Sequence, residues 1–120
     1  MDSKTTIEDI KEEIKGHCTA RDWDKFHNAK DLAIGIITEA SELLEHFRWK
    51  NEGEVKALLA DNKKRQEISE EMADVLYFLA RLAERYNIDL SDEFFKKMEK
   101  NEQKYPVEKV KGSNKKYTEL

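Results

Sequence analysis

The fold is decided by one stretch in the first half of the chain, Leu32-Ala-Ile-Gly-Ile-Ile-Thr-Glu-Ala-Ser-Glu-Leu-Leu-Glu-His-Phe47. Its apolar residues recur every three or four positions, the spacing that places side chains on one face of an α-helix. Together they form one apolar arc, which contains Leu32, Ala33, Ile36, Ile37, Ala40, Leu43, Leu44 and Phe47. The stretch therefore predicts an amphipathic helix that packs this arc against the rest of the protein.

Helical patterns also precede and follow this stretch. Asn28 is a suitable N-cap for the helix, which we expect to run to about Arg48. A capping box, Thr5-x-x-Glu8, opens the helix before it, Ser91 caps the last helix, and Pro106 ends that helix. The other expected elements are a helix over 5–20, a connector over 21–27, a short helix or irregular loop over 54–62, a long helix over 64–86 and a helix over 92–104.

No segment shows the alternation that is typical of a strand, and short connections join the helices. We therefore expect an all-α fold, an antiparallel helical bundle of four main helices. Residues 1–106 would form a single helical domain, and residues 107–120 a basic, poorly ordered C-terminal tail. The wide apolar stripe on so small a bundle also favours burial against another subunit.

Composition excludes several classes of function. The chain has 120 residues, enough for one core, and its net charge of −4 is spread over interspersed acids and bases, which disfavours nucleic acid as a partner. No apolar run is long enough to cross a membrane, and the N-terminus lacks the apolar segment of a signal peptide. Cys18 is the only cysteine, which fits a reducing compartment. We expect a cytoplasmic protein without a membrane or nucleic-acid partner.

Two acidic pairs, Glu39-x-x-Glu42 and Glu71-x-x-Asp74, stand out within helical segments. Residues three apart lie on the same face of a helix, so two packed helices could direct all four carboxylates to one point. Four negative charges repel at short range unless a cation lies between them. Oxygen ligands suit hard ions, so the pairs indicate a site for Mg²⁺, with Mn²⁺ as an alternative.

Helical phase separates these acids from their neighbours. Glu71 falls inside an apolar arc between Phe78 and Leu82, where a carboxylate is costly to bury unless it is paired or bound to a metal. Glu39 lies at the edge of its arc, whereas Glu45 faces solvent. Pairing with lysines on a solvated face is the alternative. Di-iron chemistry is disfavoured because no Glu-x-x-His repeat occurs, and zinc because no Cys/His cluster exists.

Aromatic residues flank the first acidic helix. Trp23, Phe26 and His27 precede it and Trp49 follows it, so the two tryptophans could form a stacking slot for a planar ring. The alternative, which is more common for such residues, is that they pack at the periphery of the hydrophobic core. Lysines such as Lys25 and Lys104 could bind phosphate or simply face solvent.

Five blocks of sequence occur in a characteristic order: Arg21-Asp-Trp-Asp-Lys-Phe-His27, Glu39-Ala-Ser-Glu-Leu-Leu-Glu-His-Phe-Arg-Trp49, Glu71-Met-Ala-Asp-Val75, Asn101-Glu-Gln-Lys-Tyr-Pro106 and Lys116-Tyr-Thr-Glu-Leu120. Over residues 21–120 they resemble the MazG-like nucleoside triphosphate pyrophosphohydrolases, most of all the dCTP pyrophosphatase branch. The resemblance implies an all-α protein that assembles as a homodimer or homotetramer. It also implies Mg²⁺-dependent hydrolysis of a nucleoside triphosphate, with a preference for dCTP or a similar nucleotide, to the monophosphate and pyrophosphate. Such an activity cleans the nucleotide pool.

The same resemblance implies the roles of particular residues. The metal ligands would be Glu39, Glu42, Glu71 and Asp74. The substrate would contact Trp23, Asp24, Lys25, Phe26, His27, Trp49, Phe78, Asn101, Lys104 and Tyr105. Phe78 stands where the dCTP branch carries a tyrosine and Ile14 where it carries a histidine, so base preference stays open, with His17 as a candidate replacement.

The expected reaction is attack of water on the α-phosphorus, with Glu42, the more peripheral acid of the first pair, as the catalytic base. Two alternatives remain. One is a non-catalytic helical interaction module in which the acidic pairs are solvated, and the other is a phosphohydrolase that releases orthophosphate.

Overall fold

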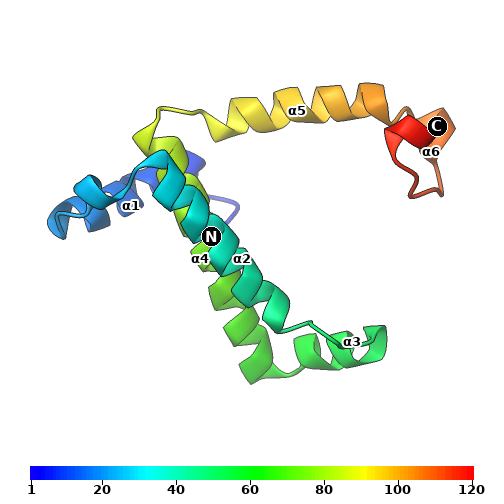
Figure 1. Cartoon of the computed structure of the whole chain (residues 1–120), viewed down its shortest axis with the longest axis horizontal. Helices are drawn as coiled ribbons and strands as arrows, with labels where there is room; N and C mark the ends of the chain where they lie inside the picture. Colours follow the sequence, from blue (N-terminus) through cyan, green and yellow to red (C-terminus); the bar gives the residue numbers. More distant parts are fainter. The chain divides into compact units, whose positions relative to one another are not determined.

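The computed structural model describes all 120 residues and contains helices, turns and no strand, which confirms the expected all-α fold. The chain forms two compact units, Met1–Asn87 and Ile88–Leu120. This division differs from the boundary at residue 106 expected from composition, because composition does not report which helices pack together. The first unit contains α1 (Ile7–Ala20), η1 (Asp24–Phe26, a 3₁₀ turn), α2 (Ala29–Glu45), α3 (Glu52–Ala60) and α4 (Asn62–Arg85) (Figure 1).

The first unit is built around α4. Helix α2 runs beside α4 in the opposite direction, and α1 and α3 also pack against α4 (Figure 1). The buried apolar side chains come from three helices and are few: Ile14, Cys18, Leu32, Ile68, Ala80 and Ala83. Cys18, Ala80 and Ala83 are small, which lets α1 approach α4 closely.

Side-chain caps set where the helices begin. Asn28 caps α2 as expected, because its Oδ1 accepts a hydrogen bond from the Asp31 backbone N–H at 2.8 Å. The expected box at Thr5 is wrong: Thr6 forms it, one position later, with Asp9. Ser91 is also wrong as the cap of the last helix. An aspartate two positions earlier, Asp89, takes that place, and short polar residues so close together give the same signal in sequence.

The segment after α2 is a regular helix rather than an irregular loop. Asn51 and Glu54 form a capping box that starts α3, and Asp61 ends α3 and caps α4 at once. The long helix α4 therefore starts at Asn62, two residues before the expected position. Helix α3 then lies against α4 near the start of that helix.

The second unit contains α5 (Leu90–Lys104), α6 (Val107–Val110) and η2 (Tyr117–Glu119). The tail over 107–120, expected to be poorly ordered unless something binds it, contains two short helical elements and folds back on the end of α5. The ring centroids of Tyr105 and Tyr117 lie 6.1 Å apart, and the Lys104 ammonium lies 4.8 Å from the Tyr117 ring. These aromatic contacts give the polar tail a partner that its composition does not reveal.

Apolar side chains remain exposed along one face of α2 and one face of α4. Ile37 and Leu44, which the apolar arc was expected to bury, are 66% and 60% exposed. The arc covered by α4 is therefore narrower than the periodicity predicts. The exposed residues on these two faces are Ile34, Ile37, Leu44, Met72, Leu76 and Leu79. No helix in the structure has the length and apolar character needed to cross a membrane.

Candidate active site

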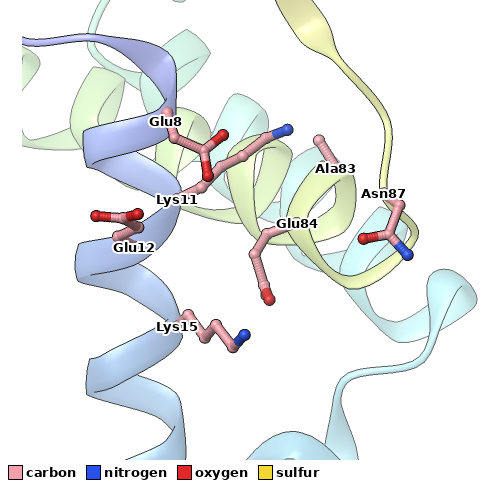
Figure 2. Close-up of a pocket in the computed structure, with 7 residues that line it drawn as sticks. All are labelled: Glu8, Lys11, Glu12, Lys15, Ala83, Glu84 and Asn87. Atoms are coloured by element: carbon pink, nitrogen blue, oxygen red, sulfur yellow. The ribbon is translucent and has the colours of Figure 1, made fainter.

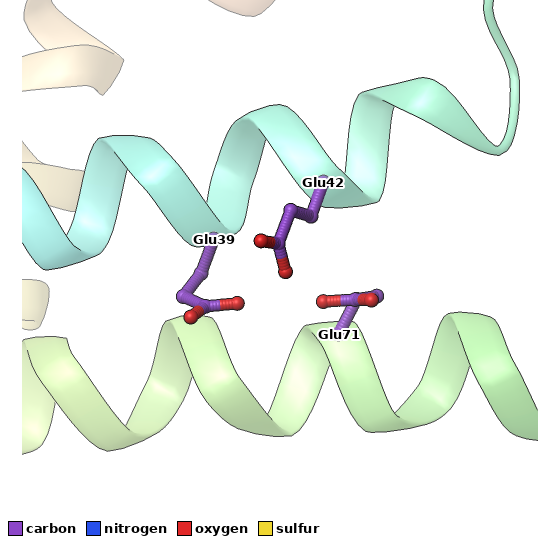
Figure 3. Close-up of side chains that lie close together, drawn as sticks. All are labelled: Glu39, Glu42 and Glu71. Carbon is purple, nitrogen blue, oxygen red and sulfur yellow. The ribbon is translucent and has the colours of Figure 1, made fainter.

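Three carboxylates meet between α2 and α4. Glu39 and Glu42 extend from α2, and Glu71 reaches toward them from α4 (Figure 3). One oxygen from each lies within 4.8 Å of the others. Two helices packed in opposite directions thus bring together acids that lie about 30 residues apart in the chain. The convergence expected from the spacing is present for these three residues.

The cluster is short of positive charge. Glu39 Oε2 and Glu71 Oε2 are both buried, and no protein group donates a hydrogen bond to either. Burial raises the pKa of Glu39 to about 7, helped by the hydrogen bond and negative charge of Glu42. The pKa of Glu71 is also raised, chiefly by burial and then by Glu42, although His46 opposes the change from 4.0 Å. Buried oxygens without a partner are what a bound cation would satisfy.

Asp74, the fourth expected ligand, stands beside this group but outside it. Its carboxylate does not belong to the set within 4.8 Å. Its negative charge nevertheless helps raise the pKa values of Glu39 and Glu71, so it lies within electrostatic reach of both. Its role as a ligand stays a prediction.

Glu45, which helical phase assigned to solvent, and two other glutamates near the cluster in sequence are paired on the surface. Glu45 accepts from Arg48 at 3.2 Å, Glu67 from Lys64 at 3.2 Å, and Glu70 from the Gln66 amide at 3.4 Å. Each of these bonds joins residues three or four positions apart and is exposed. Buried oxygens without a partner therefore distinguish Glu39 and Glu71 from acids of the same type on the same helices.

A pocket of about 470 Å³ adjoins the carboxylates. Glu39 and Asp74 lie on its wall, and the rest of the lining is mainly apolar and aromatic. A concave, largely apolar surface with a few polar groups at one end is typical of a small-molecule site. The residues around the pocket are Glu13, Ile14, His17, Trp23, Glu39, Asp74, Tyr77 and Phe78.

The aromatic rings are held in contact by close packing. Trp23 meets His17 edge to face with ring centroids 5.5 Å apart, and Tyr77 meets Phe78 at 5.1 Å. A Cβ on Gly35 would lie only 2.5 Å from the Phe78 ring. The glycine therefore lets this ring approach the backbone of α2, which sets the wall of the pocket next to Glu39.

Tyr77 was not expected at this site. It follows Asp74 by three positions on α4 and precedes Phe78, so the helical face that carries Asp74 was the signal that could have found it. Its hydroxyl contacts the Cys18 thiol at 3.2 Å, and burial raises the pKa of Tyr77 to about 12. His17, the candidate replacement for a histidine at position 14, also lines the pocket.

Asp24 and His27, expected to bind substrate, have protein partners instead. Both contact the guanidinium of Arg81 on α4: the Nε of Arg81 donates to His27 Nδ1 at 2.9 Å, and an Nη donates to the Asp24 carboxylate. Arg81 lowers the pKa of Asp24, mainly through this hydrogen bond. Arg81 is not predictable as a site residue from the sequence, because no local pattern links it to a connector more than 50 residues earlier.

Lys25 and Phe26 are not part of the pocket lining. Lys25 forms an exposed ion pair with Asp22 at 2.9 Å, and its ammonium lies 5.4 Å from the Phe26 ring, which is itself exposed. Of the connector residues expected to bind substrate, only Trp23 lines the pocket. The substrate contacts expected of the others stay predictions.

Trp49 lies beyond the other end of α2. A helix of 17 residues is about 25 Å long, so the structure does not bring Trp23 and Trp49 together within one chain. Trp49 is 88% exposed and has a φ of 64°, a conformation that is strained for a bulky side chain. The Arg48 guanidinium lies 5.0 Å from its ring. A role in substrate binding stays a prediction.

Asn101, Lys104 and Tyr105 belong to the second unit, at the end of α5. Lys104 faces the ring of Tyr117, and Tyr105 meets the same ring. Their expected contacts with substrate stay predictions.

A second hollow, of about 230 Å³, lies between α1 and the end of α4 (Figure 2). It has acids and bases on its walls and no aromatic ring, which makes it a poor match for a planar base. Its lining residues are Glu8, Lys11, Glu12, Lys15, Ala83, Glu84 and Asn87.

Comparison with known proteins gives one consistent result. A family model described as "MazG-like family" matches residues 34–120. Rat dCTP pyrophosphatase 1 is 38% identical over 115 residues, and human dCTP pyrophosphatase 1 is 36% identical over 115 residues; each match covers 96% of this chain and 68% of the relative. The crystal structure of a pyrophosphatase from Archaeoglobus fulgidus superposes with a TM-score of 0.77 at 37% identity, covering 82% of this chain and 91% of that one.

Proposed function

This chain belongs to the MazG-like family, and on that premise we propose that it is a nucleoside triphosphate pyrophosphohydrolase, which converts its substrate to the nucleoside monophosphate and pyrophosphate. The observation that carries the proposal is that the carboxylate cluster and the aromatic pocket adjoin each other. Glu39 belongs both to the carboxylate cluster and to the wall of the aromatic pocket. A nucleotide has a planar base at one end and a chain of phosphates at the other, so it matches such a pair of surfaces.

The carboxylate cluster fits a hard divalent cation such as Mg²⁺, because its ligands are oxygens and two of those oxygens are buried without a partner. Glu39, Glu42 and Glu71 would hold the ion, with Asp74 as a fourth ligand. When bound, Mg²⁺ neutralises charge on phosphate oxygens and lowers the pKa of water. Mn²⁺ has similar ligand preferences and is the alternative.

The protein side chains supply orientation and proton transfer. Trp23 and Phe78 would hold the base against the apolar wall, so that the phosphates extend past Asp74 toward the carboxylates. Glu42 is exposed, whereas Glu39 and Glu71 are partly buried. We assign the catalytic base to Glu42, because an exposed carboxylate can accept a proton from water and release it to solvent.

The substrate we propose is dCTP or a closely related deoxynucleoside triphosphate, in keeping with the names of the rat and human relatives. Ile14 and Phe78 offer the base no hydrogen bond, and the Tyr77 hydroxyl already contacts Cys18. His17 is then the pocket residue best suited to bind a polar edge of the base. Such an enzyme would act on the nucleotide pool of the cytoplasm.

A screen of canonical and modified deoxynucleoside triphosphates with Mg²⁺, analysed by phosphorus NMR, tests the proposal. We expect monophosphate and pyrophosphate in equal amounts. Orthophosphate as the first product would show a phosphohydrolase instead. If no triphosphate is cleaved, and Mg²⁺ with a non-hydrolysable analogue gives no joint thermal stabilisation, the chain is a non-catalytic interaction module.

We also propose that the protein assembles as a homodimer or homotetramer. The support is the pair of exposed apolar faces on α2 and α4, which leave the first unit with a small core and large side chains in solvent. Sedimentation of the wild type should give more than one chain per particle, and Ile37→Lys should shift the distribution toward the monomer. A monomeric wild type would refute this assembly.

A further inference from the structure

Arg81 is the one charged residue that is buried in this structure. Its side chain is fully covered, and taking a guanidinium out of water is costly unless its N–H groups are paired. Each of its three nitrogens has a partner: Nε donates to His27 Nδ1 at 2.9 Å, Nη1 to Glu84 at 2.5 Å, and Nη2 to Asp24. The burial is thus compensated by three side chains, two of which lie on the connector between α1 and α2.

The connector has few other ties to α4. Its 3₁₀ turn is three residues long and has no side-chain cap, and its backbone bonds are local, from Phe26 N to Trp23 O and from His27 N to Asp24 O. Arg85 adds only long contacts, at 3.9 Å to the Asp24 carboxylate and 3.4 Å to its carbonyl. Arg81 therefore supplies the short contacts that hold this segment on α4.

Trp23, the residue of the connector that lines the aromatic pocket, sits directly before these contacts. Its backbone N–H donates to the Cys18 carbonyl of α1 at 3.0 Å, and its ring lies 6.3 Å from the ring of His27. One side of Trp23 is thus held by α1 and the other by residues that Arg81 holds.

The same contact determines the state of His27. An arginine Nε always carries its proton, so His27 Nδ1 accepts through its lone pair and the imidazole proton resides on Nε2. Burial, and then the positive charge of Arg81, lower the pKa of His27 from its ordinary value. A neutral ring with one defined tautomer has one orientation beside Trp23.

We propose that Arg81 is a positioning residue for the nucleotide base: by binding Asp24 and His27 together, it holds the Trp23 ring at the pocket wall. The inference rests on the proposed function and extends it. Asp74 and Arg81 lie seven positions apart on one rigid helix, two turns or about 10 Å along its axis. Helix α4 would thereby set the distance between the base and the phosphates.

The test compares variants that remove different contacts of the Arg81 guanidinium. Asp24→Asn and Arg81→Lys loosen the connector, because lysine cannot reproduce the planar fork. Glu84→Gln is the matched control: it weakens the ion pair between Arg81 and Glu84 but leaves both bonds from Arg81 to the connector. In a Trp49→Phe background Trp23 is the only tryptophan, so acrylamide quenching without substrate reports its accessibility directly.

We expect Asp24→Asn and Arg81→Lys to raise the quenching constant of Trp23 about twofold. In the Trp49-containing protein they should raise KM about tenfold with kcat changed by less than about twofold. Glu84→Gln should change neither quenching nor KM, even where it lowers the melting temperature.

Three results would overturn the inference. Unchanged quenching in Asp24→Asn and Arg81→Lys would show that Arg81 does not hold Trp23. Equal KM effects in Asp24→Asn and Glu84→Gln would reduce the role to general stability. Additive KM effects in the double variant of Asp24→Asn and Arg81→Lys would place Asp24 on the substrate itself. An inactive wild type would refute the proposed function, and the quenching result would then still decide whether Arg81 holds Trp23.

Discussion

Two clusters on helix α4 bury charge in opposite ways. Around Arg81, every nitrogen of the guanidinium has an acceptor, and two of the acceptors come from the connector. Around Glu71, ten positions earlier, three carboxylates meet, and two of their buried oxygens have no donor at all. Both clusters lie in the first unit and both involve helix α4.

This difference in hydrogen-bond pairing indicates a structural role for the Arg81 cluster and a ligand-binding role for the carboxylate cluster. A fully paired buried charge satisfies itself and fixes the elements that it joins. A buried charge without a partner raises the free energy of the unliganded protein. Its presence in the folded structure therefore indicates that a bound cation pairs with it. Removing a residue from the first cluster should therefore affect stability and, through the position of Trp23, KM. Removing a residue from the second cluster should affect kcat.

The largest expected effect is on catalysis. Glu71→Gln removes a charge from the carboxylate cluster and should lower kcat/KM by about a hundredfold or more, because the cation loses a buried ligand. Stability without metal should change little, or increase, since a repulsive carboxylate is gone. The measurement is pyrophosphate release in Mg²⁺ alongside thermal unfolding in EDTA.

Glu70→Gln is the control for this change. Glu70 precedes Glu71 on the same helix but is exposed and bonded to Gln66. We expect activity close to that of the wild type. Equal losses in the two variants, or none in either, would contradict the assignment of the cluster as the metal site.

The next effect is on folding. Arg81→Met removes the cation that Asp24 and Glu84 share, and Glu84 is only 15% exposed. We expect the free energy of unfolding to fall by about 2–4 kcal/mol, which urea titration measures. Arg85→Met, whose contact with Asp24 is long and partly solvated, should cost under about 1 kcal/mol. Similar costs for both would mean that burial does not set the importance of Arg81.

The two clusters should also respond oppositely to pH. In the folded protein the pKa of Glu39 is raised from 4.5 to about 7, so between these values the folded state binds more protons than the unfolded state. Without divalent metal, Glu39 therefore makes the free energy of unfolding fall as pH rises through this window. The pKa of Asp24 is lowered from 3.8, so its contribution is present above 3.8 and is lost as pH falls below that value.

Urea titrations in EDTA at several pH values, repeated with Glu39→Gln and Asp24→Asn, isolate the two contributions. The difference between wild type and Glu39→Gln should shift against the wild type as pH rises toward about 7. A pH-independent difference would contradict the unpaired state of this carboxylate. Mg²⁺ should reverse the trend, because the cation binds the deprotonated form.

The smallest effect should come from a charge outside both clusters. Glu45 lies on α2 three positions after Glu42, but it is exposed and pairs only with Arg48. Glu45→Gln should change the free energy of unfolding by less than about 0.5 kcal/mol and leave pyrophosphate release unaltered. A larger effect on either would show that charge near the site matters irrespective of burial.

Helical periodicity predicts much of the first unit. It locates α2 and α4, distinguishes Glu39 and Glu71 from the solvated Glu45, and predicts the convergence of Glu39, Glu42 and Glu71. Periodicity does not predict which residues of an apolar face another helix covers. Ile37 belongs to the apolar arc of α2 by phase yet is exposed, because phase identifies a face and does not report how wide a neighbour covers it.

The sequence by itself thus determined the helices, the carboxylate pairs and the family to which the chain belongs. Tertiary structure alone decided that Asp24 and His27 bind Arg81, 57 and 54 positions away, and that Tyr77 and His17 join Trp23 around one pocket. The physical reason is range. A helical face follows from residues three or four apart, whereas the partner of a buried charge depends on which distant elements pack beside it.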